Sequence, residues 1–322
     1  MVLALVFLVV GIVLLWKCAE VLVKGAVRLS EQLGVSSFVV GLTVVAMGTS
    51  APEAAASIAA TLRGVGDVAI GNIYGSNIAN LALVGGICSI IRPITVRRLT
   101  MYREIPVMVG AGLLLWPILH NLELSRIEGV LLLAIFASLL FLVVYSALRK
   151  SRAGSASAEG IDDNVVRMSR IDGLRTSVFF VIIGLAGVVL GADMVVRGAV
   201  VVGEHLGLSS AVIGLTIVAI GTSLPEFSTS LVAVIRGHHS ISIGNLVGSN
   251  IFNTLLVSGL AGTILPFGIV ERLAGTDYWI MMGVSVMFAF LVPAGRFAVA
   301  RWCGIILGGV YAAYIYYLVF LG

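Results

Sequence analysis

Two glutamates lie in the middle of long apolar stretches, and each of them follows a proline. The segment GTSAPE (48–53) ends at Glu53, and the same design returns as GTSLPE (221–226), which ends at Glu226. If such a stretch crosses a bilayer, an ionised carboxylate near its centre costs about 3 kcal/mol even on the most lenient scale. We therefore expect a partner of opposite charge. No lysine or arginine that could serve as this partner occurs in the surrounding stretches 36–62, 67–91, 209–235 and 241–265, which leaves a bound cation or protons.

Oxygen-bearing side chains accompany each glutamate at helical spacing. Thr49 lies four residues before Glu53 and so shares its helix face, which Ser50 flanks. A second polar row, with an amide or a hydroxyl at every fourth residue, follows each glutamate further along the chain. This row and the counterparts in the second half comprise Asn72, Ser76, Asn80, Thr222, Ser223, Asn245, Ser249 and Asn253.

Pro52 and Pro225 are predicted to interrupt the helices that carry the two glutamates. Because proline has no N–H, it leaves a carbonyl oxygen free one turn back. The two motifs thus offer carboxylates, hydroxyls, amide oxygens and carbonyls, all of them hard oxygen ligands. Calcium takes six to eight oxygens in a flexible cage, whereas magnesium tends to keep its waters. The pattern favours a calcium site.

The composition indicates that these motifs lie in a membrane. Of 322 residues, 59% are hydrophobic and 11% are charged, and the mean hydropathy is +1.12, which excludes a soluble globular protein. Apolar runs of about 20 residues, long enough to cross the hydrocarbon core as helices, recur along the chain. We predict an all-α polytopic membrane protein with ten transmembrane helices at 2–23, 36–62, 67–91, 104–120, 127–148, 175–197, 209–235, 241–265, 278–293 and 302–321.

The two halves of the chain repeat each other at a shift of 173 residues. GLTVVAMGTSAPE (41–53) and GLTIVAIGTSLPE (214–226) are identical at ten of thirteen positions, and GNIYGSNIAN (71–80) and GNLVGSNIFN (244–253) at seven of ten. Chance likeness between apolar helices would match Leu and Val rather than Asn, Thr, Pro and Glu. The predicted units are a first five-helix repeat (1–148), a polar linker loop (149–174) and a second five-helix repeat (175–322).

Basic residues are distributed unevenly between the two sides of the predicted membrane. The loops after helices 1, 3, 5, 7 and 9 hold fifteen Lys and Arg, and the loops on the other side hold four. Since basic residues concentrate on the cytoplasmic side, we predict a cytoplasmic 149–174 loop and both termini outside. Five is an odd number, so the second repeat enters the membrane inverted. Inverted repeats are typical of secondary transporters that bind their substrate at the midplane, which indicates alternating access.

Other interpretations of the same residues were weighed against an ion site. A cation channel would need a continuous pore, usually built by symmetric subunits, which inverted repeats around one enclosed site do not favour. An enzyme would need a base to activate Ser50 or Ser223, and no His or Lys lies at a helix-compatible spacing, so we expect no enzymatic activity. Glu20 and Asp193 lie near helix ends, close to Lys24 and Arg197, where structural ion pairs are expected.

At these motifs the sequence resembles the calcium/cation antiporter superfamily, in particular the prokaryotic members of its sodium/calcium exchanger branch. The resemblance covers the whole chain and rests on GTSAPE…GNIYGSNIAN and GTSLPE…GNLVGSNIFN. It implies exchange of Ca²⁺ for Na⁺ at one mid-membrane cluster, with helices 1 and 6 sliding across the other eight as a gate. The ligands that it implies are the side chains of Thr49, Ser50, Glu53, Ser76, Asn80, Thr222, Ser223, Glu226, Ser249 and Asn253, and the carbonyls of Ala46 and Ala219.

Asn253 departs from several relatives, including potassium-dependent exchangers, which carry Asp at this position. The site therefore holds two carboxylates, which one Ca²⁺ or two protons would balance, whereas three Na⁺ would leave one positive charge. The residues alone leave a Ca²⁺/H⁺ antiporter open as the alternative, and the resemblance favours Na⁺. We expect no cofactor and no nucleic-acid partner. The expected partners are calcium ions, sodium ions and the bilayer of the cell membrane, with a monomer as the working unit.

Overall fold

The computed structural model describes residues 1–152, 173–206 and 219–320, and most of these residues are helical. In the first half the helices are α1 (Val2–Leu33), α2 (Ser37–Val40), η1 (Gly41–Val45), α3 (Ala46–Thr49), α4 (Ala51–Leu62), α5 (Gly66–Ile78), η2 (Ala79–Val84), α6 (Gly85–Ile91), α7 (Arg98–Tyr102), α8 (Glu104–Leu119) and α9 (Arg126–Arg152). In the second half they are α10 (Leu174–His205), α12 (Ala219–Thr222), α13 (Leu224–Ile235), α14 (His239–Ile251), η5 (Phe252–Val257), α15 (Ser258–Ile264), η6 (Leu273–Asp277), α16 (Tyr278–Ala294) and α17 (Arg301–Phe320). The η elements are π-helical turns.

The lengths of these helices confirm a polytopic helical membrane protein. Eight described helices are long and apolar enough to cross a membrane, and a bent pair, Ser37–Thr49 with Ala51–Leu62, makes a ninth candidate. In the second half, Leu224–Ile235 is apolar but shorter than a span. The rest of the predicted helix 209–235 lies mostly outside the described residues, as does most of the predicted linker 149–174.

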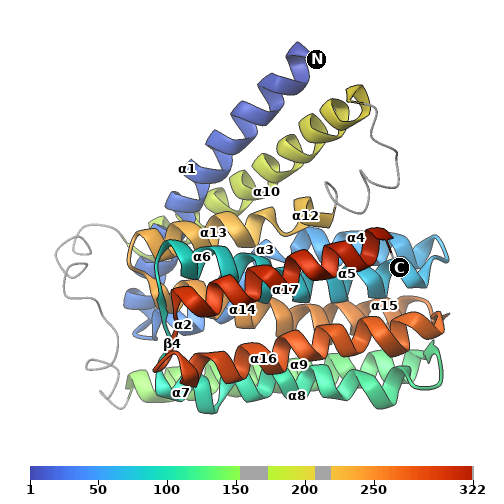
Figure 1. Cartoon of the computed structure of the whole chain (residues 1–322). Helices are drawn as coiled ribbons and strands as arrows, with labels where there is room; N and C mark the ends of the chain where they lie inside the picture. Colours follow the sequence, from blue (N-terminus) through green and yellow to red (C-terminus); the bar gives the residue numbers. More distant parts are fainter. Residues whose placement is uncertain (153–172, 207–218, 321–322) are drawn as a thin grey trace.

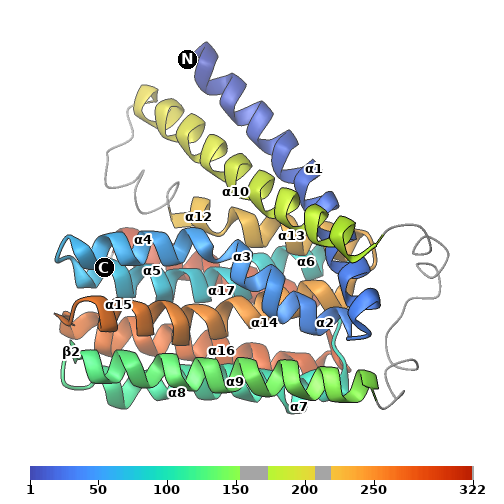
Figure 2. The same ribbon diagram turned by 180° about the vertical axis from the view of Figure 1, so that it is seen from behind.

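The long helices α1 and α10 pack against each other as an antiparallel pair. A Cβ on Gly11 would lie 2.9 Å from the carbonyl oxygen of Gly191, and one on Gly184 would lie 2.6 Å from the backbone nitrogen of Leu22. Since glycine lets two backbones approach this closely, the pair is held by tight packing. Figures 1 and 2 show that it projects at an angle from the other helices.

Both helices of this pair extend further than the sequence predicted. The helix predicted at 2–23 continues to Leu33, where Gly34 closes it with a φ of 63°. The helix predicted at 175–197 continues to His205. The basic residues that were taken to mark helix ends, Lys24 and Arg197, lie within continuous helices, because small residues beyond them keep the two backbones in contact.

The remaining helices lie side by side in a bundle below this pair in Figure 1. Its core is apolar and aromatic: Tyr74 meets Tyr278 edge to face with ring centroids 6.2 Å apart, and Phe288 is fully buried. The Tyr278 hydroxyl donates to the carbonyl of Gly112 at 3.2 Å, which satisfies its one polar atom inside the core.

Short strands connect the two halves at the ends of this bundle. β1 (Ile94–Thr95) pairs with β4 (Ala298–Val299), and β2 (Glu123–Leu124) pairs with β3 (Phe267–Gly268), both antiparallel. Each ladder therefore takes one strand from each half of the chain. β1 and β3 are 173 residues apart, so the two ladders match each other under the sequence repeat.

Candidate functional site

Glu53 and Glu226 each lie in the first turn of a helix that starts inside the bundle. The span that contains Glu53 bends by 44° at Ser50, between α3 and α4, and the corresponding break in the second half is at Ser223, between α12 and α13. Proline at the second position of each new helix accounts for the breaks, because it cannot donate to the preceding turn. Both glutamates thus face the positive end of a helix dipole, which favours a carboxylate. Both are fully buried.

Direct hydrogen bonds bring the two motifs together in one site. The Ser50 hydroxyl donates to Oε1 of Glu226 at 2.8 Å, across 176 residues of sequence. The Thr49 hydroxyl donates to Oδ1 of Asn245 at 3.1 Å. The predicted ligands of the first half therefore lie against those of the second half, around a single centre.

An asparagine side chain fixes the backbone beside Glu53. The amide nitrogen of Asn72 donates to the backbone carbonyl of Glu53 at 3.2 Å and to the Ser57 hydroxyl at 2.9 Å. The sequence placed Asn72 in the polar row but did not single out Ser57. A signal was present, because Ser57 lies four residues after Glu53 and recurs as Ser230.

The second half repeats this arrangement. The amide nitrogen of Asn245 donates to the backbone carbonyl of Glu226 at 3.4 Å and to the Ser230 hydroxyl at 3.0 Å. Asn245 thus fixes one half through its nitrogen and contacts Thr49 of the other half through its oxygen. Both asparagines orient the backbone that carries a glutamate, and their place is behind the carboxylates.

Asn80 and Asn253 lie in π-helical turns, η2 and η5, which the sequence did not predict. A π turn widens the helix locally, and such turns are frequent at functional sites. The row Asn72, Ser76 and Asn80 was predicted from regular helical spacing, and the wide turn shifts its last member away from that face. The two π turns begin and end 173 residues apart, so both halves carry the distortion at the same place.

A further group of amides joins the halves beside these turns. The Asn77 amide donates to the Thr254 hydroxyl at 2.9 Å, and the Asn80 amide lies 3.5 Å from Oδ1 of Asn250. The sequence missed these contacts. Asn77 and Asn250 occupy the same position in the two copies of the GSN motif, and that identity was the available signal.

The carbonyl of Ala46 is not free of hydrogen bonds in this structure. It accepts the backbone N–H of Ser50 at 3.0 Å and the Thr49 hydroxyl at 3.3 Å. The carbonyl that lacks a donor because of Pro52 is that of Gly48, four residues before the proline. In the second half, Ala219 and Thr222 are the first and last residues of α12. The assignment of Ala46 and Ala219 as ligands stays a prediction.

Buried polar atoms without a hydrogen-bond partner gather at this centre. Leaving such an atom unpaired costs about 1–3 kcal/mol, and more for a charged group. Among the residues that the structure describes, neither buried glutamate has a lysine or arginine partner. Ser76 is also buried there, on α5. The atoms without a partner are both carboxylate oxygens of Glu53, Oε2 of Glu226, the hydroxyls of Ser223 and Ser249, Oδ1 of Asn80 and both side-chain polar atoms of Asn253.

This arrangement suits a cation and offers nothing for hydrolysis. Ser50 donates its proton to a carboxylate rather than to a histidine or lysine, so no activated nucleophile is formed. Within the described residues, no group of three or more His, Cys, Asp and Glu is placed to hold a metal ion. The site instead offers two carboxylates surrounded by neutral oxygens, which fits a calcium ion in transit.

Comparison with known proteins gives a consistent result. The family described as "Sodium/calcium exchanger protein" matches residues 3–145 and 176–320. The "Inner membrane protein YrbG" of Escherichia coli (strain K12) is 35% identical, and the match covers 99% of this chain and 98% of the relative. The "Sodium/calcium exchanger MaX1" of Methanosarcina acetivorans is 31% identical, with 98% of each chain covered.

Solved structures support the same relationship. The structure of the sodium-calcium exchanger NCX_Mj in 10 mM Na⁺ and zero Ca²⁺ superposes with a TM-score of 0.80 at 30% identity, and covers 100% of this chain and 99% of that chain. Further structures of the same exchanger, obtained with Sr²⁺ or with other ion concentrations, give TM-scores of 0.79 to 0.81. The likeness therefore extends over the whole fold.

Proposed function

The chain belongs to the sodium/calcium exchanger family, a family of membrane transporters, and from this premise we propose that it exchanges Ca²⁺ for Na⁺ by alternating access. The ions bind between Glu53 and Glu226. The oxygens of the surrounding ligands come from Thr49, Ser50, Ser76, Asn80, Thr222, Ser223, Ser249 and Asn253, and from the carbonyls of Ala46 and Ala219.

The observation that carries this proposal is the group of buried oxygens without partners. Two fully buried carboxylates have no cationic side chain beside them, and three of their four oxygens accept no hydrogen bond. A buried charge without a partner is strongly unfavourable, so a bound cation or protons must accompany the two acids. A Ca²⁺ ion would neutralise both carboxylates and coordinate the hydroxyl and amide oxygens at once.

The proposed architecture is ten transmembrane helices in two inverted five-helix repeats, 1–148 and 175–322, joined by the loop 149–174. Three observations support it. The repeat-related helices α1 and α10 run antiparallel, the two strand ladders match under the repeat, and each glutamate has the same asparagine and serine behind it. In a transporter of this kind the two halves rock about one fixed site.

The charge balance at this site makes sodium exchange sensitive to voltage. One Ca²⁺ matches two carboxylates, whereas three Na⁺ exceed them by one charge. Moving one charge across the membrane is worth about 2.3 kcal/mol per 100 mV. An inside-negative potential therefore favours sodium entry coupled to calcium extrusion. The working unit is a monomer in the cell membrane.

The experiment that tests the proposal measures ⁴⁵Ca²⁺ uptake into proteoliposomes that contain the purified protein. We expect uptake when the vesicles are loaded with Na⁺ and diluted into Na⁺-free buffer, and none when K⁺ or choline replaces Na⁺ inside. A matched arm imposes a pH gradient without Na⁺. Uptake in the pH arm alone would replace Na⁺ by H⁺ as the counter-ion, and uptake without any counter-ion gradient would indicate a channel.

A further inference from the structure

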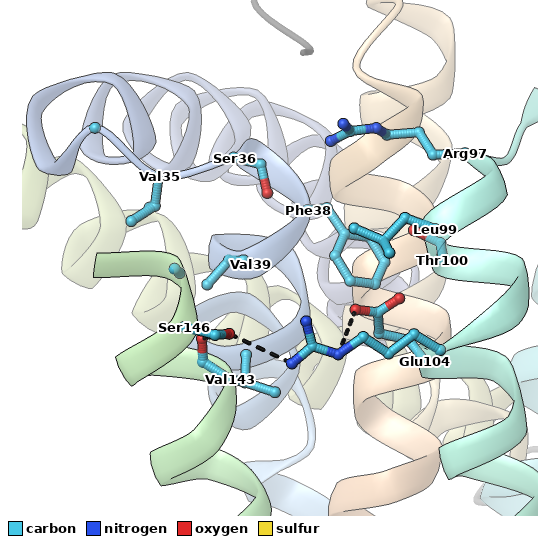
Figure 3. A pocket seen from close by; sticks show the side chains of 13 residues that line it. Val35, Ser36, Phe38, Val39, Arg97, Leu99, Thr100, Glu104, Val143 and Ser146 are labelled. Carbon is cyan, nitrogen blue, oxygen red and sulfur yellow. Dashed lines mark hydrogen bonds and ion pairs between the residues drawn. The ribbon is translucent and has the colours of Figure 1, made fainter. Parts of the chain in front are cut away.

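A pocket with charged walls opens where the second membrane span begins, beside α7, α8 and the end of α9 (Figure 3). It encloses about 760 Å³ of space, and Arg97, Arg103, Glu104 and Ser146 are among the residues that line it. Arg103 is held in position: its Nη2 donates to the Ser146 hydroxyl at 3.3 Å, and its Nε lies 3.8 Å from the Glu104 carboxylate. Two arginines against one glutamate give this wall one net positive charge, so it suits an anion.

An apolar groove of about 870 Å³ continues from this pocket. The two spaces share Arg103, Glu104 and Val143 in their walls, so the pocket and the groove are joined. Beyond the shared residues the groove is lined almost entirely by hydrocarbon side chains. These are Leu42, Met47, Val107, Phe136, Leu139, Leu140, Leu142, Ile251 and Phe252.

The combined space runs inward from its charged end along two helical segments. On the second span its lining passes from Val39 in the pocket to Met47 in the groove, and on α9 it passes from Ala147 to Phe136. At 1.5 Å of rise per residue these steps correspond to about 12 Å and 16 Å. Half of a hydrocarbon core is about 15 Å thick. The space therefore has the length and the polarity gradient of one lipid in one leaflet.

We propose that the pocket and the groove together bind an anionic phospholipid. Its phosphate group lies between Arg97 and Arg103, and an acyl chain fills the groove. Arginine binds phosphate oxygens in pairs, and basic pockets between transmembrane helices are recognised sites for anionic headgroups. The apolar groove joined to the charged pocket distinguishes a lipid from free phosphate, which would leave the groove empty.

The charged pocket is specific to one half of the chain. The residues that correspond to Arg97 and Arg103 after a shift of 173 are Val270 and Thr276. The repeat keeps the ion ligands in both halves but does not keep these arginines. A lipid bound here would therefore contact one end of the fold only.

The groove also lies directly behind the candidate ion site. Gly248 and Phe252 line it, and they are the sequence neighbours of the proposed ligands Ser249 and Asn253. An acyl chain in the groove would pack against the outer face of α14 and η5. We therefore expect the occupied site to support these helices during exchange.

Native mass spectrometry of the full-length protein in detergent tests this proposal. Phosphatidylglycerol and phosphatidylcholine with identical acyl chains are added separately, and the first should bind at least fivefold more tightly to one site. Arg97→Gln should weaken phosphatidylglycerol binding about fivefold. Arg98→Gln is the matched control, because its guanidinium stacks on Phe297 instead of lining the pocket, and it should bind as the wild type does.

A second pair of variants tests the apolar end. Leu139→Trp fills the groove and should lower the affinity for both lipids, whereas Val144→Trp on the same helix lines neither space and should not. Inorganic phosphate at millimolar concentration should not displace the lipid. Equal binding of the two lipids, or equal losses in Arg97→Gln and Arg98→Gln, would overturn the proposal. These outcomes do not depend on which ions the protein exchanges.

Discussion

Glu20 on α1 forms an ion pair with Arg236 at the end of α13, whereas the residues that correspond to them under the repeat, Asp193 and Arg63, do not pair with each other. Asp193 instead contacts Arg197, one turn further along its own helix, at 2.7 Å. Arg63 has no ion pair among the described residues. One half of the molecule is thus linked by its acid and the other half is not.

This asymmetry corrects one expectation from the sequence and confirms another. Glu20 was expected to pair near Lys24, but it contacts Arg236 and, at 3.8 Å, Lys17. The contact with Arg236 forms between helices because the first turns of α13 and its end both pack beside α1. The pairing of Asp193 with Arg197 was predicted and is present.

We predict that the opposite state of the exchanger pairs Asp193 with Arg63 and separates Glu20 from Arg236. In a variant without Cys18, Cys88 and Cys303, a disulfide between Glu20→Cys and Arg236→Cys should stop exchange, and reduction should restore it. A disulfide between Asp193→Cys and Arg63→Cys should also stop exchange, in the other state. The two crosslinks should be mutually exclusive in a four-cysteine variant, with gel mobility as the measurement. Simultaneous formation in one molecule would rule out the reciprocal arrangement.

Neutralising either buried glutamate should abolish calcium transport while the protein remains folded. Glu53→Gln and Glu226→Gln keep the shape of the side chain and remove the charge that balances the cation. We expect ⁴⁵Ca²⁺ uptake to fall to the level of empty vesicles, with an unchanged elution volume in size-exclusion chromatography. Glu271→Gln, at an exposed position, is the control and should transport normally. Normal exchange in either site variant would exclude that glutamate from the site.

The two asparagines behind the glutamates should differ in importance. Asn72→Ala removes two hydrogen bonds within the first half, whereas Asn245→Ala also removes the contact with Thr49 across the halves. At about 1 kcal/mol per bond, we expect the apparent calcium affinity to fall at least fivefold in Asn72→Ala and further in Asn245→Ala. Asn121→Ala, which loses one exposed local bond, is the control. Equal losses in the two site variants would show that the contact with Thr49 contributes nothing.

Much of this site could be predicted from the sequence because its residues are polar in an apolar chain and occur twice. Glu53, Glu226 and their hydroxyl neighbours could therefore be grouped without coordinates. The π turns at Asn80 and Asn253 could not, since regular helical spacing was assumed and no local sequence signal marks a wide turn. The long ends of α1 and α10 were missed for a related reason: charged residues do not end a helix when close packing continues beyond them.

The orientation of the chain is a separate prediction that depends on its basic residues. With fifteen Lys and Arg on one side and four on the other, both termini should lie outside and 149–174 should lie in the cytoplasm. Cysteines introduced at Val2 and in the loop 149–174 of a variant without native cysteines report this through a membrane-impermeant thiol reagent. The reagent should label intact cells at Val2→Cys only. Labelling of the loop in intact cells would reverse the topology, and labelling at neither or both sites would contradict the inverted five-plus-five arrangement.

Asn253 is the position where one substitution should change the ion balance of the site. Its side chain is fully buried, and neither polar atom has a hydrogen-bond partner. Asn253→Asp would add a third carboxylate close to the other two, and a buried charge of this kind needs a further positive charge beside it. We therefore expect transport by the variant to depend more steeply on pH near neutrality, since a proton can supply that charge, and to respond to K⁺, which can supply it too.

The measurement is the current across a membrane that contains either the wild type or the Asn253→Asp variant, under matched Na⁺, H⁺ and K⁺ gradients. With two carboxylates, the wild type should carry an inward current as Na⁺ enters and Ca²⁺ leaves, because three Na⁺ exceed the charge of the site by one. In the variant, a third negative charge cancels that excess, so the Na⁺-dependent current per Ca²⁺ should shrink unless K⁺ or H⁺ is co-transported. Adding K⁺ on one side should then restore it. Identical currents in the two proteins would place Asn253 outside the ion path, and a wild type that runs only on a proton gradient would make H⁺ the counter-ion.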